Sequence, residues 1–186
     1  MEKLIKLTTK EEIASQLRAL IFSGELSDGE EVTQNEVAES LSLSRMPVRE
    51  AFLLLTEEGL LTRLANRHIA VNGMTFNRAS AYFKRLIASD CIALDYIKSF
   101  ENAEDEISWH KTLLSSSDDA LISSICTSAL CGYIEYFFLK KRDENRFSVL
   151  RRIGDDLLNG KMEEAKKSLN GVYLDMLITQ LEVEFA

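Results

Sequence analysis

The sequence predicts a mainly α-helical protein, with an N-terminal winged helix-turn-helix over residues 1–74 and an antiparallel helical bundle over residues 75–186. Apolar residues recur at helical spacing through most of the chain. The whole chain contains one proline, and only four glycines follow position 75. Two short candidate strands follow the third predicted helix. Three helices and then a hairpin is the order of a winged helix-turn-helix.

The first predicted helix begins near Thr8 and Thr9, which precede Glu11 and Glu12 at the spacing of a capping box. Its apolar residues share one face for about four turns until Gly24, namely Ile13, Leu17, Leu20 and Ile21. Residues 26–29 then predict a turn, and Val32 lies in a short extended piece.

A second capping box, formed by Thr33 and Glu36, opens a short helix. After a turn at residues 42–43, Ser44 is the expected N-cap of a third helix. Pro47 lies in the first turn of this helix, where its missing N–H costs no hydrogen bond. The buried face of the third helix is expected to carry Val48, Ala51, Phe52 and Leu55, and the helix ends at Gly59.

The remaining elements are a hairpin and a series of helices. Residues 60–64 and 69–71 read as two strands around a polar tip. The chain then predicts helices at about 76–99, 104–116, 118–140, 144–158 and 161–183. The expected N-caps are Thr75, Ser117 and Asp143, and Gly160 separates the last two helices.

Composition limits the class of protein. No apolar run follows the N-terminal lysines, and nowhere are there eighteen consecutive apolar residues, so we expect no signal peptide and a cytoplasmic chain that does not enter a membrane. Cys91, Cys126 and Cys131 lie among apolar residues and are expected to be reduced, buried thiols. The net charge is −8, and residues 1–74 contain eight Lys/Arg against twelve Asp/Glu. General affinity for nucleic acid should therefore be weak, and DNA binding would depend on a few well-placed arginines.

Arg45 and Arg49 are four residues apart, so they share one face at the start of the third helix. That is where side chains of a recognition helix reach bases in the major groove, and arginine is the usual partner of guanine. Ser44 and the helix N-terminus can hold a phosphate. The alternative is that both arginines simply pair with Glu39 or Glu50. The full set of expected DNA-binding residues is Thr33, Asn35, Ser44, Arg45, Met46, Pro47, Arg49, Asn66, Arg67 and His68.

These strings resemble the GntR family of transcription regulators. The resemblance is carried by GELSDG at residues 24–29, EVAESL at 36–41, SRMPVREAF at 44–52 and EGL at 58–60, and it covers most of residues 8–71. It implies that Arg45 and Arg49 are base-reading residues. Leu53 and Leu54 stand where many members have arginines, and His68 replaces the usual wing glycine.

The helical half resembles the FadR-type branch of this family, in which many members bind a metal through an aspartate and three histidines. Glu106 and His110 match one part of that pattern, and carboxylate and imidazole at this spacing can share a metal. Leu150 and Val172 align with the two later histidines, so we expect no metal and no cofactor, with Glu106 and His110 as weak metal candidates. A hydrogen-bonded interior role for His110 is the preferred alternative.

The sequence also allows an effector pocket that contains no metal. Its candidate lining is Arg85, Trp109, His110, Tyr133 and Arg146, with Asp90, Tyr96 and Tyr136 as further polar or aromatic residues. Equally, the aromatic residues near Tyr133 fit a core or a dimer interface.

The sequence thus predicts a homodimeric regulator, a repressor rather than an activator, on a palindromic DNA operator, with or without a small-molecule effector. One alternative is an effector-free regulator whose helical domain only dimerises. Another is a protein-interaction adaptor whose winged helix has lost DNA binding, and a third is an enzyme using Glu106 and His110, for which no further catalytic motif is present.

Overall fold

The computed structural model describes residues 10–66, 68–97, 99–101 and 103–186, which divide into two compact units, Met1–Thr75 and Phe76–Ala186. The N-terminal unit is a winged helix-turn-helix and the C-terminal unit is a bundle of antiparallel helices, so the predicted fold class is confirmed. Thr8, Thr9 and Arg67, to which the sequence assigns a helix cap and a DNA contact, lie outside the described residues.

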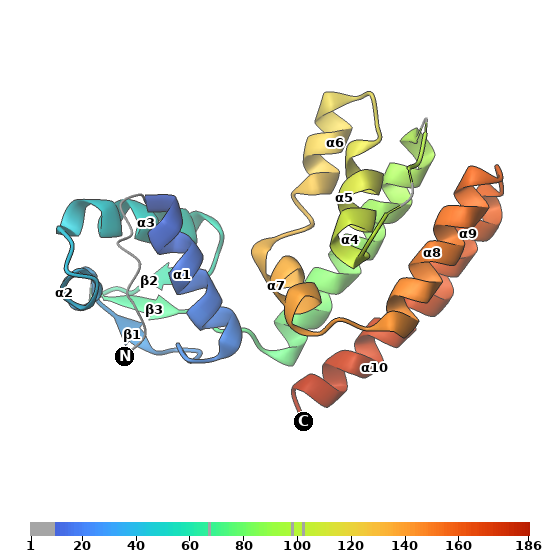
Figure 1. Cartoon of the computed structure of the whole chain (residues 1–186). Coiled ribbons are helices and arrows are strands. Elements are labelled where there is room, and N and C mark those ends of the chain that lie inside the picture. The colour runs from blue at the N-terminus through green and yellow to red at the C-terminus, as the bar shows by residue number, and fades with distance from the viewer. Residues whose placement is uncertain (1–9, 67, 98, 102) are drawn as a thin grey trace. The chain divides into compact units, whose positions relative to one another are not determined.

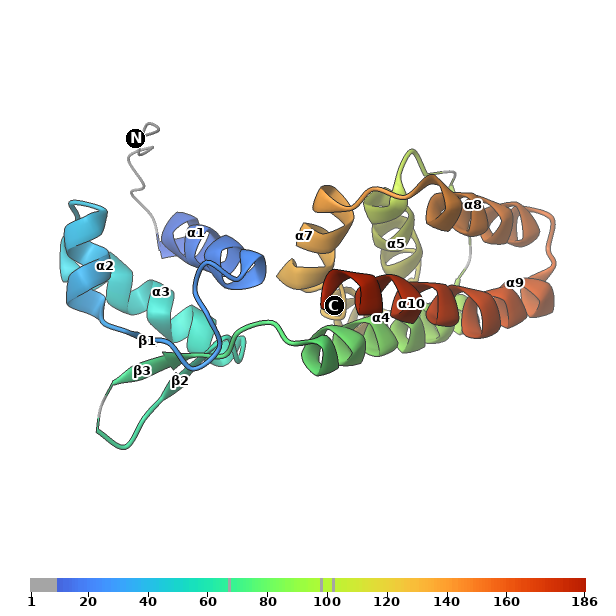
Figure 2. The ribbon, with the colours of Figure 1, turned by 90° about the horizontal axis from the view of Figure 1, so that it is seen from below.

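The N-terminal unit combines three helices with a small sheet. Its elements are α1 (Lys10–Ser23), β1 (Glu31–Val32), α2 (Gln34–Ser40), α3 (Arg45–Glu57), β2 (Leu61–Arg63) and β3 (Ile69–Val71). The sheet is antiparallel in the order β1-β3-β2, with Arg63 opposite Ile69 across the hairpin. Figure 2 shows this hairpin extending from the helices as the wing.

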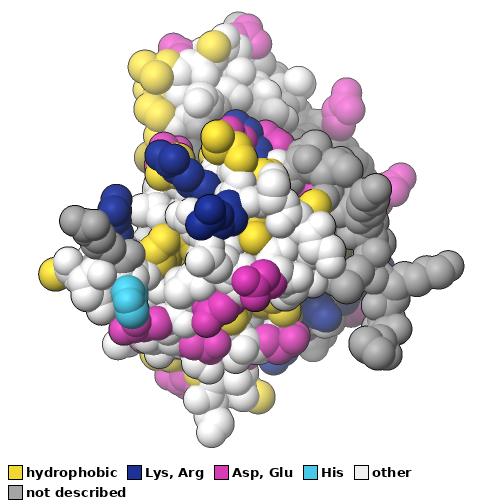
Figure 3. Space-filling model, turned by 90° about the vertical axis from the view of Figure 1, so that its left-hand side faces the viewer, with side chains coloured by type: hydrophobic (Ala, Val, Ile, Leu, Met, Phe, Trp, Pro, Cys, Tyr) yellow, Lys and Arg dark blue, Asp and Glu magenta, His cyan; other side chains and the backbone are white. Residues whose placement is uncertain are grey.

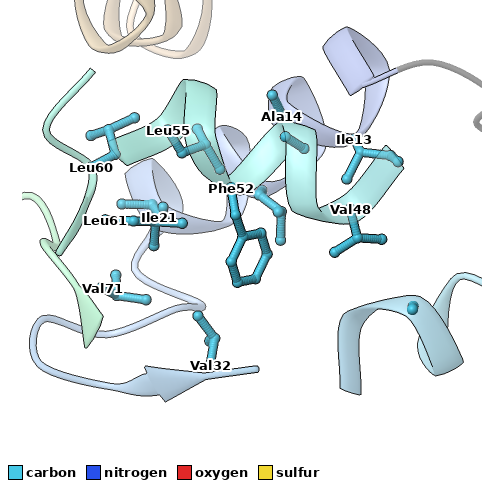
Figure 4. Packing of buried hydrophobic residues seen from close by; sticks show 13 residues of the cluster. Ile13, Ala14, Ile21, Val32, Val48, Phe52, Leu55, Leu60, Leu61 and Val71 are labelled. Carbon is cyan, nitrogen blue, oxygen red and sulfur yellow. The ribbon is translucent and has the colours of Figure 1, made fainter. Parts of the chain in front are cut away.

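One apolar core holds these elements together. Phe52 on α3 lies between α1 and the sheet (Figure 4), within a cluster of buried residues to which every element of the unit contributes. At the end of α3, Gly59 has φ +78°, a left-handed conformation that costs glycine little. The chain then turns directly into β2, which fixes the wing relative to the recognition helix.

The C-terminal unit contains only helices among its described residues. They are α4 (Phe76–Tyr96), α5 (Glu106–Ser115), α6 (Ala120–Thr127), α7 (Gly132–Lys140), α8 (Glu144–Leu158), α9 (Met162–Ser168), the π-helical turn η1 (Leu169–Tyr173) and α10 (Leu174–Glu184). Figures 1 and 2 show α10 running beside α4. A cluster of aromatic rings that includes Phe83, Tyr133 and Phe137 fills the space between α4 and α7.

The prediction of one helix over 118–140 was wrong. The structure breaks it into α6 and α7, which meet at an angle of 57°. Ser128 donates from its hydroxyl to the carbonyl of Ile125 (2.7 Å), and Gly132, a poor helix former, follows shortly after. The N-cap is also Asp119 instead of Ser117, because its carboxylate accepts from the amides of Leu121 and Ile122.

No single helix among the described residues is long and apolar enough to cross a membrane, although the bent pair α6 and α7 together passes that test by length and composition.

Candidate nucleic-acid interface

The second predicted capping box is present and positions α2. The hydroxyl of Thr33 accepts from the amide of Glu36 (3.2 Å), and the Glu36 carboxylate accepts from the amide of Thr33 (3.0 Å). Both side chains are therefore occupied in holding the start of the helix. Asn35, in the first turn of α2, accepts from the Arg45 guanidinium at 3.3 Å. This bond joins α2 to the start of α3.

Arg45 and Arg49 are both exposed on the first two turns of α3. Within the described residues, neither forms an ion pair with Glu39 or Glu50, and Arg49 forms no hydrogen bond or ion pair at all. Met46 between them is 63% exposed. An arginine held by a neutral amide and a second arginine without an acidic partner keep their positive charge available to a ligand.

Ser44 occupies the N-cap position of α3 in extended backbone, but its side chain makes no capping hydrogen bond. The first amides of α3 therefore point outward beside a hydroxyl group. Such an arrangement favours an anion, because the helix N-terminus carries partial positive charge and unpaired N–H groups.

Two adjoining grooves lie beside the wing, and the larger one also borders the recognition helix α3. One, of about 350 Å³, is lined by Gln34, Phe52, Leu53, Thr56, Ile69 and the arginines Arg49 and Arg63. The other, of about 250 Å³, is lined by Val32, Thr33, Gln34, Asn35, His68 and Ile69. The shared residues Gln34 and Ile69 connect them. The fold thus gathers residues from α2, α3 and the hairpin around one continuous surface.

The wing itself carries less free charge than the sequence suggests. The ring of His68 contacts the carboxylate of Glu31 through Nδ1, and its amide donates to the Asn66 side chain at 3.0 Å. Figure 3, which looks onto the N-terminal unit, shows the histidine beside an acidic side chain, with further acidic side chains close by. Glu31 therefore weakens the wing as an anion contact.

Sequence reasoning missed Arg63 and Gln34. Arg63 is exposed on β2, and its place opposite Ile69 in the hairpin puts it on the groove that holds Arg49. This position depends on the pairing of β2 with β3, which the residues next to Arg63 in the sequence do not reveal. Gln34 is the first residue of α2 and lines both grooves.

The C-terminal candidates do not all meet at one place. Arg85 is exposed on α4 and donates to Ser128 (2.9 Å), whereas Trp109, His110, Tyr133 and Arg146 are buried. Tyr133 donates to Glu184 at 3.4 Å, and burial, followed by the negative charge of Glu184, raises its pKa well above the ordinary value. The four buried side chains pack against one another or against the shared rings of Phe137 and Phe138, whereas Arg85 lies outside that packing.

Glu106 and His110, the candidate metal pair, face different partners. Arg146 donates two hydrogen bonds to the Glu106 carboxylate, at 2.7 and 2.9 Å, and it also contacts Gln180 and the Lys141 carbonyl. Burial raises the pKa of Glu106, while the Arg146 guanidinium opposes that rise. A metal ion bound to Glu106 would have to displace this guanidinium, so the pair does not fit a metal.

His110 instead forms a buried group with Asp90 and Tyr173. Its Nδ1 lies 2.8 Å from an Asp90 oxygen, an ion-pair contact whose angle is poor for a hydrogen bond, and its Nε2 is 3.3 Å from the Tyr173 hydroxyl. Burial raises the pKa of Asp90, although His110 acts in the opposite direction. Among the described residues, no three His, Cys, Asp or Glu side chains are placed to hold a metal ion.

Val172, which the resemblance aligns with a later histidine of the family, does not face the interior of the bundle. Val172 is 50% exposed, and Tyr173 is the residue that lies inside against His110. The π-helical turn Leu169–Tyr173 accounts for the difference, because its extra residue per turn shifts which side chains face the core.

Comparison with known proteins agrees with this geometry. Residues 9–71 match the family model described as bacterial regulatory proteins, gntR family. The chain is 27% identical over 107 residues to YdhC, an uncharacterised helix-turn-helix transcriptional regulator of Bacillus subtilis, covering 58% of this chain and 47% of the relative. It is 27% identical over 182 residues to the gluconate operon transcriptional repressor of the same organism, covering 82% and 74%.

The chain therefore spans about half the length of the first of these relatives and about three quarters of the second. Among solved structures, a transcriptional regulator of Rhodococcus sp. RHA1 superposes with a TM-score of 0.59 at 20% identity, over 95% of this chain and 99% of the other. At that identity the superposition shows a common fold, which extends through both units.

Proposed function

Because the chain carries a domain of the gntR family of bacterial regulatory proteins at residues 9–71, we propose that it is a sequence-specific DNA-binding transcription regulator. The observation that carries the proposal is the exposure of Arg45 and Arg49, without acidic partners, at the start of a helix flanked by a wing. In this proposal α3 enters the major groove, and each arginine recognises a guanine through two hydrogen bonds.

The neighbouring residues have complementary roles. Ser44 and the first amides of α3 would hold a backbone phosphate. Exposed Met46 supplies an apolar contact of the kind that fits a thymine methyl group. Asn35 fixes the direction of Arg45, and Arg63 adds a phosphate contact beside Arg49.

The charge of the N-terminal unit argues for a dimer. Residues 1–74 contain four more acidic than basic residues, and Arg18 is tied to Glu58 through two hydrogen bonds of 2.9 and 2.6 Å. One unit therefore neutralises few phosphates and binds weakly. A homodimer on a palindromic operator adds the contributions of two half-sites, which favours this assembly.

Repression is the regulatory direction that we propose, since one relative across most of the chain is named a repressor. A DNA partner implies that the protein acts in the cytoplasm. We propose no catalytic role, because Arg146 occupies Glu106 and Asp90 occupies His110, the two residues that an enzyme would need.

For the C-terminal unit, two roles were open, namely effector binding and dimerisation alone. The buried candidates for an effector pocket already pack against one another or hold intramolecular partners. This observation favours a helical unit that only dimerises.

The test is a titration of the protein against a duplex from the region upstream of its own coding sequence, with a scrambled duplex as control. We expect binding to the first duplex at least tenfold tighter than to the second, with a shallow dependence on salt because few phosphates are neutralised. Equal binding to both duplexes, or none at low salt, would support the adaptor alternative instead.

A further inference from the structure

One face of α4 is exposed in the bundle although it carries apolar residues. Ile92 and Tyr96 are 44% and 48% exposed, and Ala81 and Ala88 are exposed on the same side, so that the four residues follow one another at spacings of seven, four and four. Helical positions at these spacings form one stripe along the surface. We call Ala81, Ala88, Ile92 and Tyr96, with Lys84, Arg85 and Asp95 beside them, the α4 face.

Neighbouring helices continue this surface. On one flank Arg85 donates to Ser128, and Leu121 and Ile125 precede Ser128 along α6 with 68% and 53% exposure. On the other flank Asp95 pairs with Lys166 of α9. The α4 face is thus an apolar stripe between two polar edges, in a patch larger than isolated exposed side chains would make.

The α4 face is complementary to itself when a second copy runs antiparallel to it. The midpoint between Ala88 and Ile92 is position 90. In an antiparallel pair centred there, Ala88 of each copy would lie opposite Ile92 of the other, so a small side chain would meet a large one. Arg85 and Tyr96 are centred within half a residue of the same position, and so are Lys84 and Asp95. The second pairing places a guanidinium on an aromatic ring, and the third joins opposite charges.

The residues on the two sides of the apolar stripe also have the arrangement that a two-fold symmetric dimer requires. A two-fold axis perpendicular to two antiparallel helices brings each flank of one helix against the same flank of the other. Arg85 and Tyr96 are eleven residues apart, which is about three turns, so they share a flank. The same holds for Lys84 and Asp95 on the opposite flank. All three pairings can therefore form at once.

We infer that the α4 face is the surface on which a second copy of this chain packs, with the two α4 helices antiparallel and centred at position 90. This rests on the proposed homodimer and names its contact. A different partner would need a matching order of small, large and charged groups. The chain already contains that order on the same helix, which is why we assign the face to self-association.

Sedimentation of the full chain is the first test. Ile92→Glu would bring two carboxylates into the centre of the interface, and we expect it to raise the dimer dissociation constant by roughly a hundredfold. Leu158→Glu is the matched control, since Leu158 is 54% exposed at the end of α8. We expect that variant to sediment like the unaltered chain, and circular dichroism would verify folding of both.

The outcomes separate the two proposals. A monomeric unaltered chain at micromolar concentration would overturn the homodimer itself and, with it, this inference. An unaltered dimer that Ile92→Glu leaves intact would overturn only the assignment of the α4 face.

Site-specific cross-linking tests the register. In a Cys91→Ser background, co-expressed Ala88→Cys and Ile92→Cys chains should form a disulfide dimer, because these positions lie level across helices spaced about 8 Å apart. Each variant alone should not, since identical positions are offset by four residues, or about 6 Å, along the axis. Equal cross-linking in the single variants would overturn the antiparallel register.

Discussion

The arginines of the recognition helix and wing differ in burial and in partners from Arg146 of the helical bundle. In the N-terminal unit, Arg45 is exposed at the start of α3, and Arg49 and Arg63 are exposed on the groove between α3 and the wing. In the C-terminal unit, Arg146 is 1% exposed, with its guanidinium bonded to Glu106 and lying over the ring of Phe137. An exposed arginine without an acidic partner is available to a ligand, whereas a buried and fully bonded one organises the fold.

Burial and existing partners separate binding residues from structural ones in a chain that contains both. Residue type alone would place Arg146 and His110 in a functional site as readily as Arg49. Their partners decide the matter, because a buried charge that is already neutralised can change partners only at a large desolvation cost.

The largest expected effect comes from removing the internal cation. Arg146→Met would leave the Glu106 carboxylate buried without its partner, and we expect the free energy of unfolding of the C-terminal unit to fall by about 3–5 kcal/mol. The double variant Glu106→Gln/Arg146→Met should recover most of this loss. Urea denaturation would measure both, and a loss below about 1 kcal/mol in the single variant would contradict a structural role.

The Arg146→Met substitution is also expected to change how the stability of the C-terminal unit depends on pH. Burial raises the pKa of Glu106 in the folded state, so folding takes up protons, and the stability it contributes is present at low pH and lost as pH rises through the raised pKa. Without Arg146 the opposing charge is gone, and the loss extends to higher pH. The deficit of Arg146→Met should therefore shrink on acidification from neutral pH, while the double variant shows no such trend.

A smaller effect is expected at the cap of α2. Thr33→Ala removes the hydroxyl that accepts from the Glu36 amide, and we expect about 1 kcal/mol of lost stability in the N-terminal unit. Thr33→Ser keeps the hydroxyl and serves as control. Thermal denaturation followed by circular dichroism would compare them, and equal stability of the two variants would refute the cap's contribution.

A still smaller change is expected at the wing. Glu31→Gln removes the negative charge that contacts His68, and we expect DNA to bind roughly two- to fivefold more tightly at low salt. The gain should fade as salt increases, because an exposed charge is screened. Weaker binding of the variant would mean that Glu31 supports the wing in its DNA-binding position.

We expect the purified protein to contain no stoichiometric transition metal. The Glu106 and His110 side chains face Arg146 and Asp90, so elemental analysis after purification without chelator or affinity metal should give well under one transition metal per chain. One zinc or nickel per chain that disappears in His110→Ala would show that the bundle holds a site built from other residues.

Local signals in the sequence were sufficient for the N-terminal unit. The capping box of Thr33 and Glu36, the end of α3 at Gly59 and the hairpin all depend on residues a few positions apart. The interior of the bundle could not be predicted in the same way. Glu106 meets Arg146 from 40 residues away, and the inward position of Tyr173 depends on a π-helical turn that apolar spacing does not reveal.

The break between α6 and α7 was missed for a related reason. Apolar residues continue at helical spacing through residues 120–138, and the bend depends on where the Ser128 side chain finds its partners. In the candidate interface, Arg63 was missed because its importance comes from the pairing of two strands.

We propose that the exposed arginines of α3 recognise the DNA sequence. The test is Arg49→Ala, with Arg152→Ala as the matched loss of an exposed arginine from α8 in the other unit. Titrations against the operator and a scrambled duplex at fixed salt would give the ratio of the two affinities. We expect Arg49→Ala to reduce that ratio by an amount worth about 1–3 kcal/mol and Arg152→Ala to leave it unchanged. An unaltered ratio in Arg49→Ala, and likewise in Arg45→Ala, would contradict the account.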